Sequence, residues 1–326
     1  MDNTKRNSFE RSVCNSMKLV FMGTPDFAAE SLRSLIAAGH EILAVVTQPD
    51  KPKGRGKEMA ISAVKELAIK EEIPVLQPIK VKKDEEFLEQ LKDLNPECIV
   101  VAAFGQMLPQ SILDLPKFGC INVHASLLPK YRGAAPIQWV VVNGEKEAGV
   151  TIMHMDIGCD TGDMIIKDQI TLDPKETGGS LHDKLAVLGG NLIVKALEMI
   201  EQGTAAREAQ DESQSTYYGM FKKEDGLIDF TKSAVAIERL IRGLNPWPSA
   251  YTSMEGKGLK LWAADVIEGP KKGTCGEIID VTKHEIVVQT GEGYLAIQEL
   301  QLEGKKRMPV AAFLLGYEVK VGTILG

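Results

Sequence analysis

The sequence predicts an open, mainly parallel, Rossmann-like α/β sheet followed by a smaller C-terminal domain of short strands. Apolar runs alternate with amphipathic helical stretches as far as residue 203, which is the pattern of parallel strands joined by helices. The run from Cys98 to Ala103 is apolar throughout, as expected for a central strand covered on both faces. Beyond residue 203 the pattern changes to short strand-like runs separated by glycine and lysine turns. A chain of 326 residues is also long for one compact core, so its length favours two domains.

The first unit of this pattern is a strand, a turn and a helix. Residues 18–22 form an apolar run, Gly23-Thr24-Pro25 turns the chain, and a helix is expected over residues 26–38. The turn lacks the second and third glycines of the dinucleotide-binding fingerprint, so we expect neither a nicotinamide nor a flavin cofactor. The later elements expected in this domain are strands at 42–47, 74–76, 98–105, 120–124 and 149–155, and helices at 62–71, 83–94, 136–143 and 180–202.

The C-terminal part begins after a polar stretch at 204–215 that is typical of a connector. A helix is expected over 233–244, and the short strands that follow suggest a small β-barrel, of which the oligonucleotide-binding (OB) type is one option. The expected boundaries are a disordered leader or extension at 1–16, an α/β domain at 17–204, a linker at 205–224 and the barrel domain at 225–326. The expected strands are 260–263, 276–281, 286–289, 294–300 and 318–321.

Composition and charge narrow the class of protein. The formal net charge of −7 argues against nucleic-acid binding by bulk attraction. No apolar run approaches the ~20 residues that span a bilayer, and residues 1–16 lack the apolar stretch of a secretory signal. The five cysteines show no paired spacing, and the five histidines do not cluster with cysteine or acid. We therefore expect a soluble, cytoplasmic protein without a metal site or a membrane partner, and we take it to be a monomer.

The stretch Cys120–Pro129 is the strongest candidate for a functional site. Because a strand sends successive side chains to opposite faces, Ile121 and Val123 can enter the core while Asn122 and His124 emerge together on the other face. They precede a loop rich in proline and glycine, at the end of a strand, where open α/β sheets hold their ligands. Spacing alone also fits a satisfied polar pair without a catalytic role.

An amide, an imidazole and a carboxylate together could catalyse acyl transfer to an amine. An imidazole can accept a proton from an attacking amine and pass it to a leaving nitrogen. An amide N–H can stabilise the oxyanion of a tetrahedral intermediate, and a carboxylate can orient the imidazole. Asp160 is the best candidate acid, although it could instead form the turn around it, and Asp163 competes for the role. No activated serine or cysteine joins the set, so direct transfer fits better than a covalent acyl-enzyme.

Two basic clusters are candidates for binding a polyanion. Residues 48–57 form a long loop in which basic residues alternate with proline and glycine, and a second cluster follows Gly304. The loop could equally be a solvated hairpin. Their basic residues are Lys51, Lys53, Arg55 and Lys57 in the loop, and Lys305, Lys306 and Arg307 in the second cluster.

From about Met17 to near the C-terminus, the motifs of the chain resemble those of the methionyl-tRNA formyltransferases. The Ser-Leu-Leu-Pro and Asp-Thr-Gly-Asp elements are shared by the wider family that uses 10-formyltetrahydrofolate. The Gly-Arg-Gly-Lys loop and the appended C-terminal domain narrow the resemblance to the members that modify tRNA. The motifs that carry it are 21–27, 48–57, 122–129, 132–138, 149–153 and 158–163.

The resemblance implies transfer of a formyl group from 10-formyltetrahydrofolate, as co-substrate, to the α-amine of methionyl initiator tRNA in translation initiation. It also implies that Asn122, His124 and Asp160 are the catalytic trio. The basic loop that carries Arg55 would meet the acceptor end of the tRNA, and the C-terminal domain, with the cluster 305–307, would add contacts along it. The residues implied to hold the folate are Ser126, Leu127, Leu128 and Pro129, with Phe104 and Gly105.

Three other functions stay open from the sequence. A formyltransferase acting on a small amine, such as a glycinamide ribonucleotide or an amino sugar, would share the trio but would not need the basic loop. Hydrolysis of formyltetrahydrofolate would use water as the acceptor. An RNA-binding module whose α/β domain has lost activity would not need an intact trio.

Overall fold

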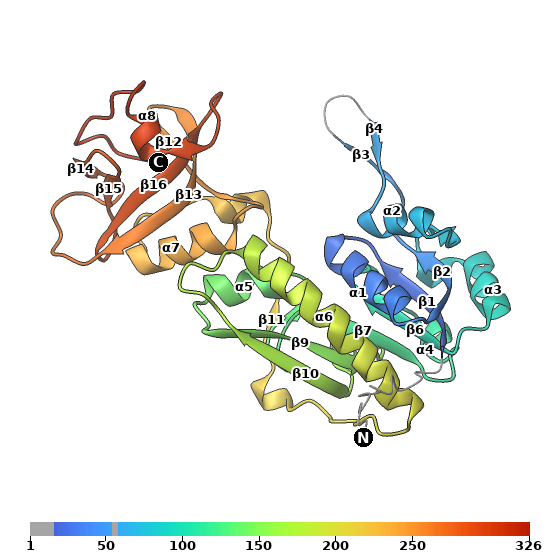
Figure 1. Cartoon of the computed structure of the whole chain (residues 1–326). Helices are drawn as coiled ribbons and strands as arrows, with labels where there is room; N and C mark the ends of the chain where they lie inside the picture. Colours follow the sequence, from blue (N-terminus) through green and yellow to red (C-terminus); the bar gives the residue numbers. More distant parts are fainter. Residues whose placement is uncertain (1–15, 54–57) are drawn as a thin grey trace, which may run out of the picture.

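The computed structural model describes residues 16–53 and 58–326. Figure 1 shows an elongated molecule, with the α/β domain and a projecting hairpin towards one end and the C-terminal domain at the other. The predicted leader lies outside the described residues except for Ser16, and so do Arg55 and Lys57 of the basic loop. Within the described part of the chain, no helix is both long enough and apolar enough to cross a membrane.

The predicted, mostly parallel central sheet is confirmed. Its strand order is β10-β9-β7-β6-β1-β2-β5, and the strands from β7 to β5 run parallel to their neighbours. At the other edge β9 runs antiparallel to β7, and β10, which the sequence analysis did not predict, runs antiparallel to β9. The strands are β1 (Lys18–Gly23), β2 (Glu41–Val46), β5 (Val75–Leu76), β6 (Cys98–Ala102), β7 (Cys120–His124), β9 (Glu147–His154) and β10 (Met164–Thr171).

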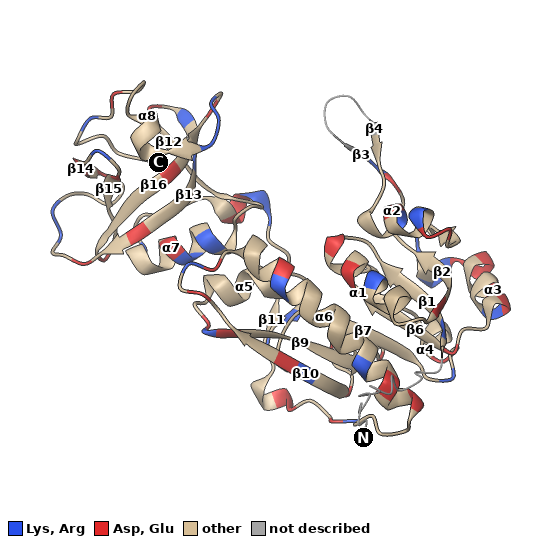
Figure 2. Ribbon diagram, in the orientation of Figure 1, with Lys and Arg blue, Asp and Glu red and all other residues tan. Residues whose placement is uncertain are grey.

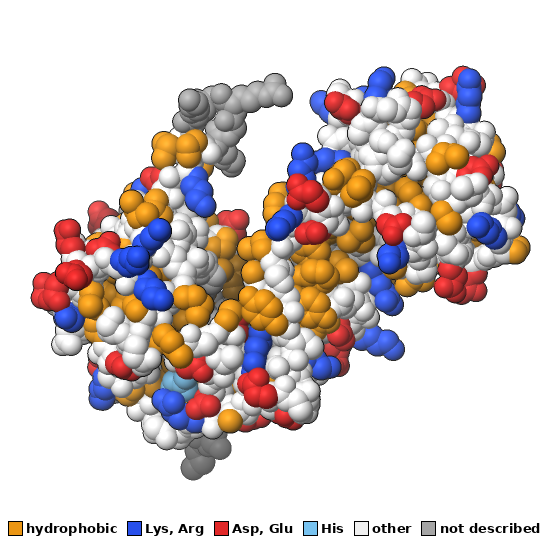
Figure 3. Space-filling model, turned by 180° about the vertical axis from the view of Figure 1, so that it is seen from behind, with side chains coloured by type: hydrophobic (Ala, Val, Ile, Leu, Met, Phe, Trp, Pro, Cys, Tyr) orange, Lys and Arg blue, Asp and Glu red, His pale blue; other side chains and the backbone are white. Residues whose placement is uncertain are grey.

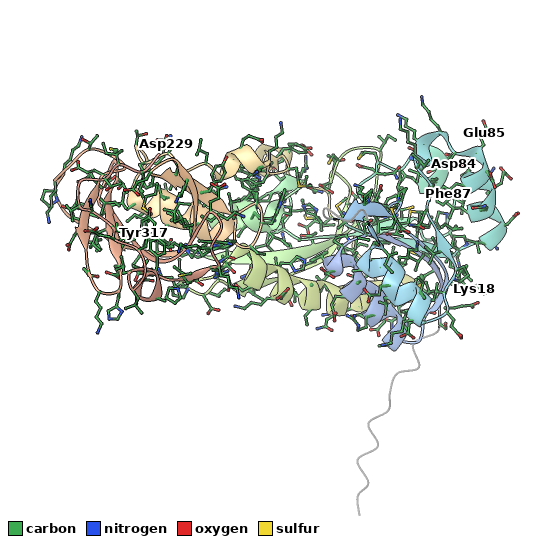
Figure 4. The ribbon with its side chains drawn as sticks, turned by 90° about the horizontal axis from the view of Figure 1, so that it is seen from above. Lys18, Asp84, Glu85, Phe87, Asp229 and Tyr317 are labelled. Carbon is green, nitrogen blue, oxygen red and sulfur yellow. The ribbon has the colours of Figure 1, made fainter. Side chains whose placement is uncertain are left out.

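Helices cover both faces of the sheet because each buries one apolar stripe. Leucines of α1 and α6 pack with Phe21, Val100 and Ile121 on one face, whereas α3 and α4 pack with the alternate residues on the other. The helix α3 begins where the Asp84 carboxylate accepts the Phe87 backbone N–H at 2.9 Å; both residues are labelled in Figure 4. The helices are α1 (Asp26–Ala37), α2 (Ala63–Lys70), α3 (Glu85–Leu94), α4 (Gln110–Leu113), α5 (Pro136–Val142) and α6 (Gly178–Glu201), with a short 3-10 helix η1 (Val81–Lys83) before α3.

The basic segment is partly a hairpin, the form that the sequence offered as the alternative to a functional loop. The strands β3 (Lys51–Lys53) and β4 (Glu58–Ala60) pair in antiparallel fashion and project from the domain (Figure 1). Pro52 lies in this two-stranded pair opposite Met59, as proline can in an edge strand. We call β3, β4 and the chain between them the hairpin arm.

The C-terminal domain is an antiparallel sheet in the order β12-β13-β16-β15-β14, with β17 beside β16. In the described chain β12 and β14 do not pair with each other, so the sheet is not a closed barrel and the predicted barrel is not confirmed. The predicted strand at 318–321 is wrong, because no strand forms there; β12 was missed. The elements are α7 (Ala234–Gly243), β12 (Ala250–Met254), β13 (Lys257–Ile267), β14 (Ile278–Val281), β15 (Ile286–Gln289), β16 (Tyr294–Leu302), β17 (Met308–Pro309) and α8 (Val310–Phe313).

The segment between the two domains packs back onto the α/β domain. Its strand β11 (Tyr217–Tyr218) runs parallel to β8 (Arg132–Gly133), which follows β7. Glu208 forms an isolated bridge with Met164 at the start of β10. The segment, which also holds the 3-10 helices η2 (Glu212–Gln214) and η3 (Lys223–Gly226), therefore does more than connect the domains.

Candidate active site

Asn122 and His124 lie on one face of β7, as the alternation predicts. Ile121 and Val123 enter the core on the side of α1 and α6. Asn122 and His124 face the other side, where they are only 9% and 6% exposed. Among the described residues, no side chain or backbone group hydrogen-bonds the Asn122 amide. Its donors and acceptor are therefore free to meet a ligand.

The His124 ring is held between a backbone carbonyl and a carboxylate. Its Nε2 lies 2.9 Å from the Tyr131 carbonyl oxygen, which can only accept, so Nε2 carries the hydrogen. Nδ1 lies 3.6 Å from Oδ1 of Asp160, beyond ordinary hydrogen-bond distance. In the neutral ring Nδ1 therefore keeps its lone pair, and a proton arriving there would meet the carboxylate.

Asp160 is aimed at His124 by the turn that carries it. The residue has a left-handed φ of 56°, and its Oδ2 accepts the Gly133 N–H at 2.9 Å. Oδ1 is the oxygen that faces the imidazole. Asp163, the competing acid, instead lies 3.8 Å from the Arg207 guanidinium. The structure thus brings Asp160, and not Asp163, to His124.

The loop 126–129 is fixed from within. The Ser126 hydroxyl donates to the Lys130 carbonyl at 2.7 Å. Thr151, fully buried on β9, donates to the Ser126 carbonyl at 2.7 Å and accepts the Leu128 N–H at 3.1 Å. The Leu128 side chain packs against Met153 and Met164. A ligand could contact this loop at its half-buried residues, Leu127 and Pro129.

Phe104 and Gly105 follow β6, the neighbour of β7 in the sheet. The Phe104 ring is 2% exposed and belongs to the core, and the Phe104 carbonyl accepts from the Gln48 amide at 3.0 Å. Gly105 takes a φ of +86°, which favours glycine. The backbone here, rather than the aromatic ring, is the part that can contact a ligand.

A cavity of about 680 Å³ lies at the start of β7, the end of the strand away from His124. It begins at Cys120, two residues before Asn122, and it is bordered by Met155, Asp156 and Ile157 of the chain that leads to Asp160. Neither the trio nor the predicted folate residues line it, so the cavity is not part of the candidate site. In the described chain no three His, Cys, Asp or Glu side chains are grouped to hold a metal ion.

The predicted polyanion-binding residues are distributed over both domains. Lys51 on the hairpin arm and Lys305 and Lys306 on the C-terminal domain are exposed. Arg307 is engaged, because its guanidinium donates to both Glu299 oxygens, at 2.7 and 2.8 Å, and its charge lies 4.6 Å from the Trp262 ring centre. Basic and acidic residues are interspersed over both domains (Figure 2). Seen from behind, the molecule is hollowed between the arm and the C-terminal domain (Figure 3).

Sequence reasoning missed a group of aromatic residues that holds the site. Tyr131, whose carbonyl binds His124, stacks on Tyr218 at 5.1 Å between ring centres. Tyr218 in turn packs on Trp139, and Trp139 stacks on Phe221 at 4.2 Å. Burial and a hydrogen bond to Glu145 raise the pKa of the Tyr131 hydroxyl, which stays neutral. The only sequence signal was the aromatic content of residues 217–221.

Comparison with known proteins agrees with this architecture. The formyl transferase family matches residues 17–197, and the formyl transferase C-terminal domain matches residues 220–318. A protein of Agathobacter rectalis named methionyl-tRNA formyltransferase is 55% identical over 307 residues, which are 94% of this chain and 99% of that protein. Its namesake in Lachnospira eligens is 52% identical over 315 residues, covering 95% of this chain and 100% of the relative.

A solved structure shares the fold. The N-formyltransferase from Helicobacter canadensis, in complex with folinic acid and dTDP-3-aminofucose, is 20% identical with a TM-score of 0.65, over 86% of this chain and 98% of that one. The matches to both domains, together with identities above one half over nearly the whole length, show that this chain belongs to the formyl transferase family, among relatives named methionyl-tRNA formyltransferase.

Proposed function

We propose that this protein transfers the formyl group of 10-formyltetrahydrofolate to the α-amine of methionyl initiator tRNA, in translation initiation. The full-length relatives named methionyl-tRNA formyltransferase support the reaction. The observation that carries it in the structure is the placement of His124 between the Tyr131 carbonyl and Asp160, beside a free Asn122 amide. No serine or cysteine nucleophile is needed, because the amine can attack the formyl carbon directly.

In the first step the amine nitrogen attacks the formyl carbon, and the carbonyl oxygen becomes an oxyanion. The Asn122 amide N–H stabilises this oxyanion, a contribution of roughly 3 kcal/mol. The amine proton moves to Nδ1 of His124, which holds the available lone pair. The imidazolium that forms donates from Nε2 to Tyr131 and lies against the Asp160 carboxylate.

In the second step the bond between the formyl carbon and N10 of the folate breaks, and the proton on Nδ1 passes to N10. The oxyanion returns to a carbonyl, and the products are formylmethionyl-tRNA and tetrahydrofolate. Asn122 thus stabilises the charge on the carbonyl oxygen, whereas His124 carries the proton from the attacking nitrogen to the leaving nitrogen. The donor would rest against the fixed loop 126–129 and the backbone at Phe104 and Gly105.

The tRNA would be held by the hairpin arm and the C-terminal domain. Lys51, Lys53, Arg55 and Lys57 of the arm would meet the acceptor end, and Lys305 and Lys306, with Arg307 contributing less because of Glu299, would contact the tRNA further along. The surface is hollowed between the hairpin arm and the C-terminal domain (Figure 3). One chain supplies every proposed contact, so a monomer would suffice. A role in translation initiation would place it in the cytoplasm.

A comparison of acceptors tests this function. With labelled 10-formyltetrahydrofolate as donor, the label should enter methionyl initiator tRNA far faster than a small amine such as an amino sugar nucleotide. Without an acceptor, little formate should appear. Preferred formylation of the small amine, or rapid formate release without any amine, would overturn the proposal.

A further inference from the structure

The turn that carries Asp160 is bound by a side chain from the segment between the domains. The Gln210 amide Nε2 donates to the backbone carbonyls of Asp160 and Gly162, each at 2.8 Å. These carbonyls belong to the left-handed residue itself and to the second residue after it. Both amide hydrogens are therefore used to hold the backbone that aims the carboxylate at His124.

Arg132 fixes which way the Gln210 amide points. Its Nε and Nη2 donate to Oε1 of Gln210 at 3.0 and 2.9 Å. A guanidinium can only donate, so the amide oxygen must face Arg132 and the NH₂ group must face the two carbonyls. Arg132 is 6% exposed and also forms two hydrogen bonds with Glu212, at 3.0 and 2.7 Å.

The two ends of this network meet at Asp160. Gly133, next to Arg132 on β8, donates its N–H to Oδ2. Gln210 holds the Asp160 backbone from the other side. Together these contacts leave only Oδ1 to face Nδ1 of His124.

We propose that Gln210 is a positioning residue for formyl transfer, because it sets the direction of the Asp160 carboxylate towards His124. Arg132 fixes the orientation of the Gln210 amide. The proposal rests on the proposed function. It assigns a mechanistic role to a segment that the sequence identifies only as a linker. Gln210 does not touch the reacting atoms and acts through Asp160 alone.

Kinetics of Gln210→Ala provide the first test. The rate of formyl transfer at saturation should fall about 10- to 100-fold, while the KM values for tRNA and donor change less than about threefold. Gln210→Glu keeps the contacts with Arg132 but replaces the NH₂ donors, so it should lose a similar factor. Gln214→Ala, an exposed glutamine of the same segment, should behave like the unchanged protein. A KM effect without a rate effect would contradict the proposal.

Nuclear magnetic resonance of the His124 ring separates this role from a general loss of stability. Its signal can be identified by its disappearance in His124→Ala. In Gln210→Ala and Gln210→Glu it should move in the same direction as in Asp160→Ala, and in Gln214→Ala it should stay in place. An unmoved His124 signal in the Gln210 variants would overturn the positioning role. The spectrum does not depend on the acceptor, so it stands even if the proposed tRNA substrate is wrong.

A double-mutant cycle gives a third, independent readout. If Gln210 acts through Asp160, adding Gln210→Ala to Asp160→Ala should lower the single-turnover rate by less than about threefold. Losses that multiply would show that Gln210 acts elsewhere, and the proposal would fall.

Discussion

At Tyr131 and Asp160 the backbone takes left-handed conformations, with φ of 58° and 56°. Such conformations are uncommon for residues other than glycine and persist where the surroundings hold them. Here both residues face His124, one through its carbonyl and one through its carboxylate. The local strain therefore coincides with the group on which the proposed proton transfer depends.

Gly133→Ala should damage the site without touching the trio. A Cβ at this position would lie 2.2 Å from the Tyr218 carbonyl oxygen, and its φ of +102° disfavours other residues. The N–H that binds Asp160 would shift, so formyl transfer should slow about tenfold or more. The free energy of unfolding should fall by about 2 kcal/mol. Steady-state kinetics and urea unfolding measure both effects.

Gly219→Ala is the matched control, because a Cβ there would meet nothing within 4 Å. It should leave both quantities nearly unchanged. Equal behaviour of the two variants would show that β8 does not set the position of Asp160.

His40 should make the stability of the protein depend on pH. Its ring is 7% exposed, and Nδ1 accepts the Met17 N–H at 3.3 Å. Burial lowers the pKa of His40 from 6.5, partly offset by Glu201 and Glu198. As pH falls below 6.5 the unfolded chain takes up the proton first, so stability is full above this pH and decreases until the folded pKa is reached.

His40→Asn keeps an acceptor for Met17 and removes the titrating group. The free energy of unfolding, measured in urea at pH 7.5 and 5.5, should therefore differ less between the two conditions than it does in the unchanged protein. His284→Asn, which removes an exposed imidazole, serves as the comparison. An unaltered pH dependence in His40→Asn would refute the assignment.

Among the elements, the hairpin arm is anchored at its base by a small polar network. The Lys65 ammonium on α2 donates to Asp50 at 2.6 Å and to Gln77 at 2.9 Å, and Gln77 donates to Asp50 at 2.8 Å. The hydrogen bond from Lys65 lowers the pKa of the Asp50 carboxyl, with Gln77 adding to the effect. The arm thus leaves the domain in a direction set by α2.

Lys65→Met should weaken the use of tRNA through this anchor. With the arm less constrained, the KM for tRNA should rise about three- to tenfold, because fewer phosphate contacts form together, while the KM for the folate stays the same. Lys70→Met, an exposed lysine in the last turn of α2, removes the same charge without the anchor. If both variants raise the KM equally, net charge rather than the anchor is responsible.

The elements also show what can be predicted from sequence. Continuous apolar runs such as Cys98–Ala102 predicted buried parallel strands correctly, because a strand covered on both faces has no polar side. The alternation at Asn122 and His124 predicted their shared face. The strand β10 was missed, because its exposed side from Lys167 to Gln169 weakens the apolar signal. Contacts made by Gln210 over 48 to 50 residues of sequence leave no local pattern at all.

For the whole molecule, α7 joins the two domains. It packs between α5 of the α/β domain and β13 of the C-terminal sheet. Glu238 on α7, 7% exposed, accepts from Lys175 at 3.2 Å and from Arg242 at 2.7 Å, and Lys175 also donates to the Ala264 carbonyl at 3.1 Å. The chain length and the change of sequence pattern after residue 203 predicted two domains. The arrangement of the domains depends on these tertiary contacts and could not be predicted.

This arrangement bears on how the substrate is bound. The trio lies on the α/β domain, and the proposed tRNA contacts lie on both the hairpin arm and the C-terminal domain, on either side of the hollow (Figure 3). Binding and chemistry are therefore expected to depend on different residues, and variants of one should spare the other.

Single-turnover formyl transfer by Asn122→Ala and His124→Ala, measured beside the Kd for methionyl-tRNA, tests this account most directly. With both substrates saturating, we expect the rate to fall about 100- to 1000-fold, while the Kd changes less than about threefold. Equal losses of rate and affinity, or an unchanged rate, would contradict the assignment of Asn122 and His124 to the chemistry.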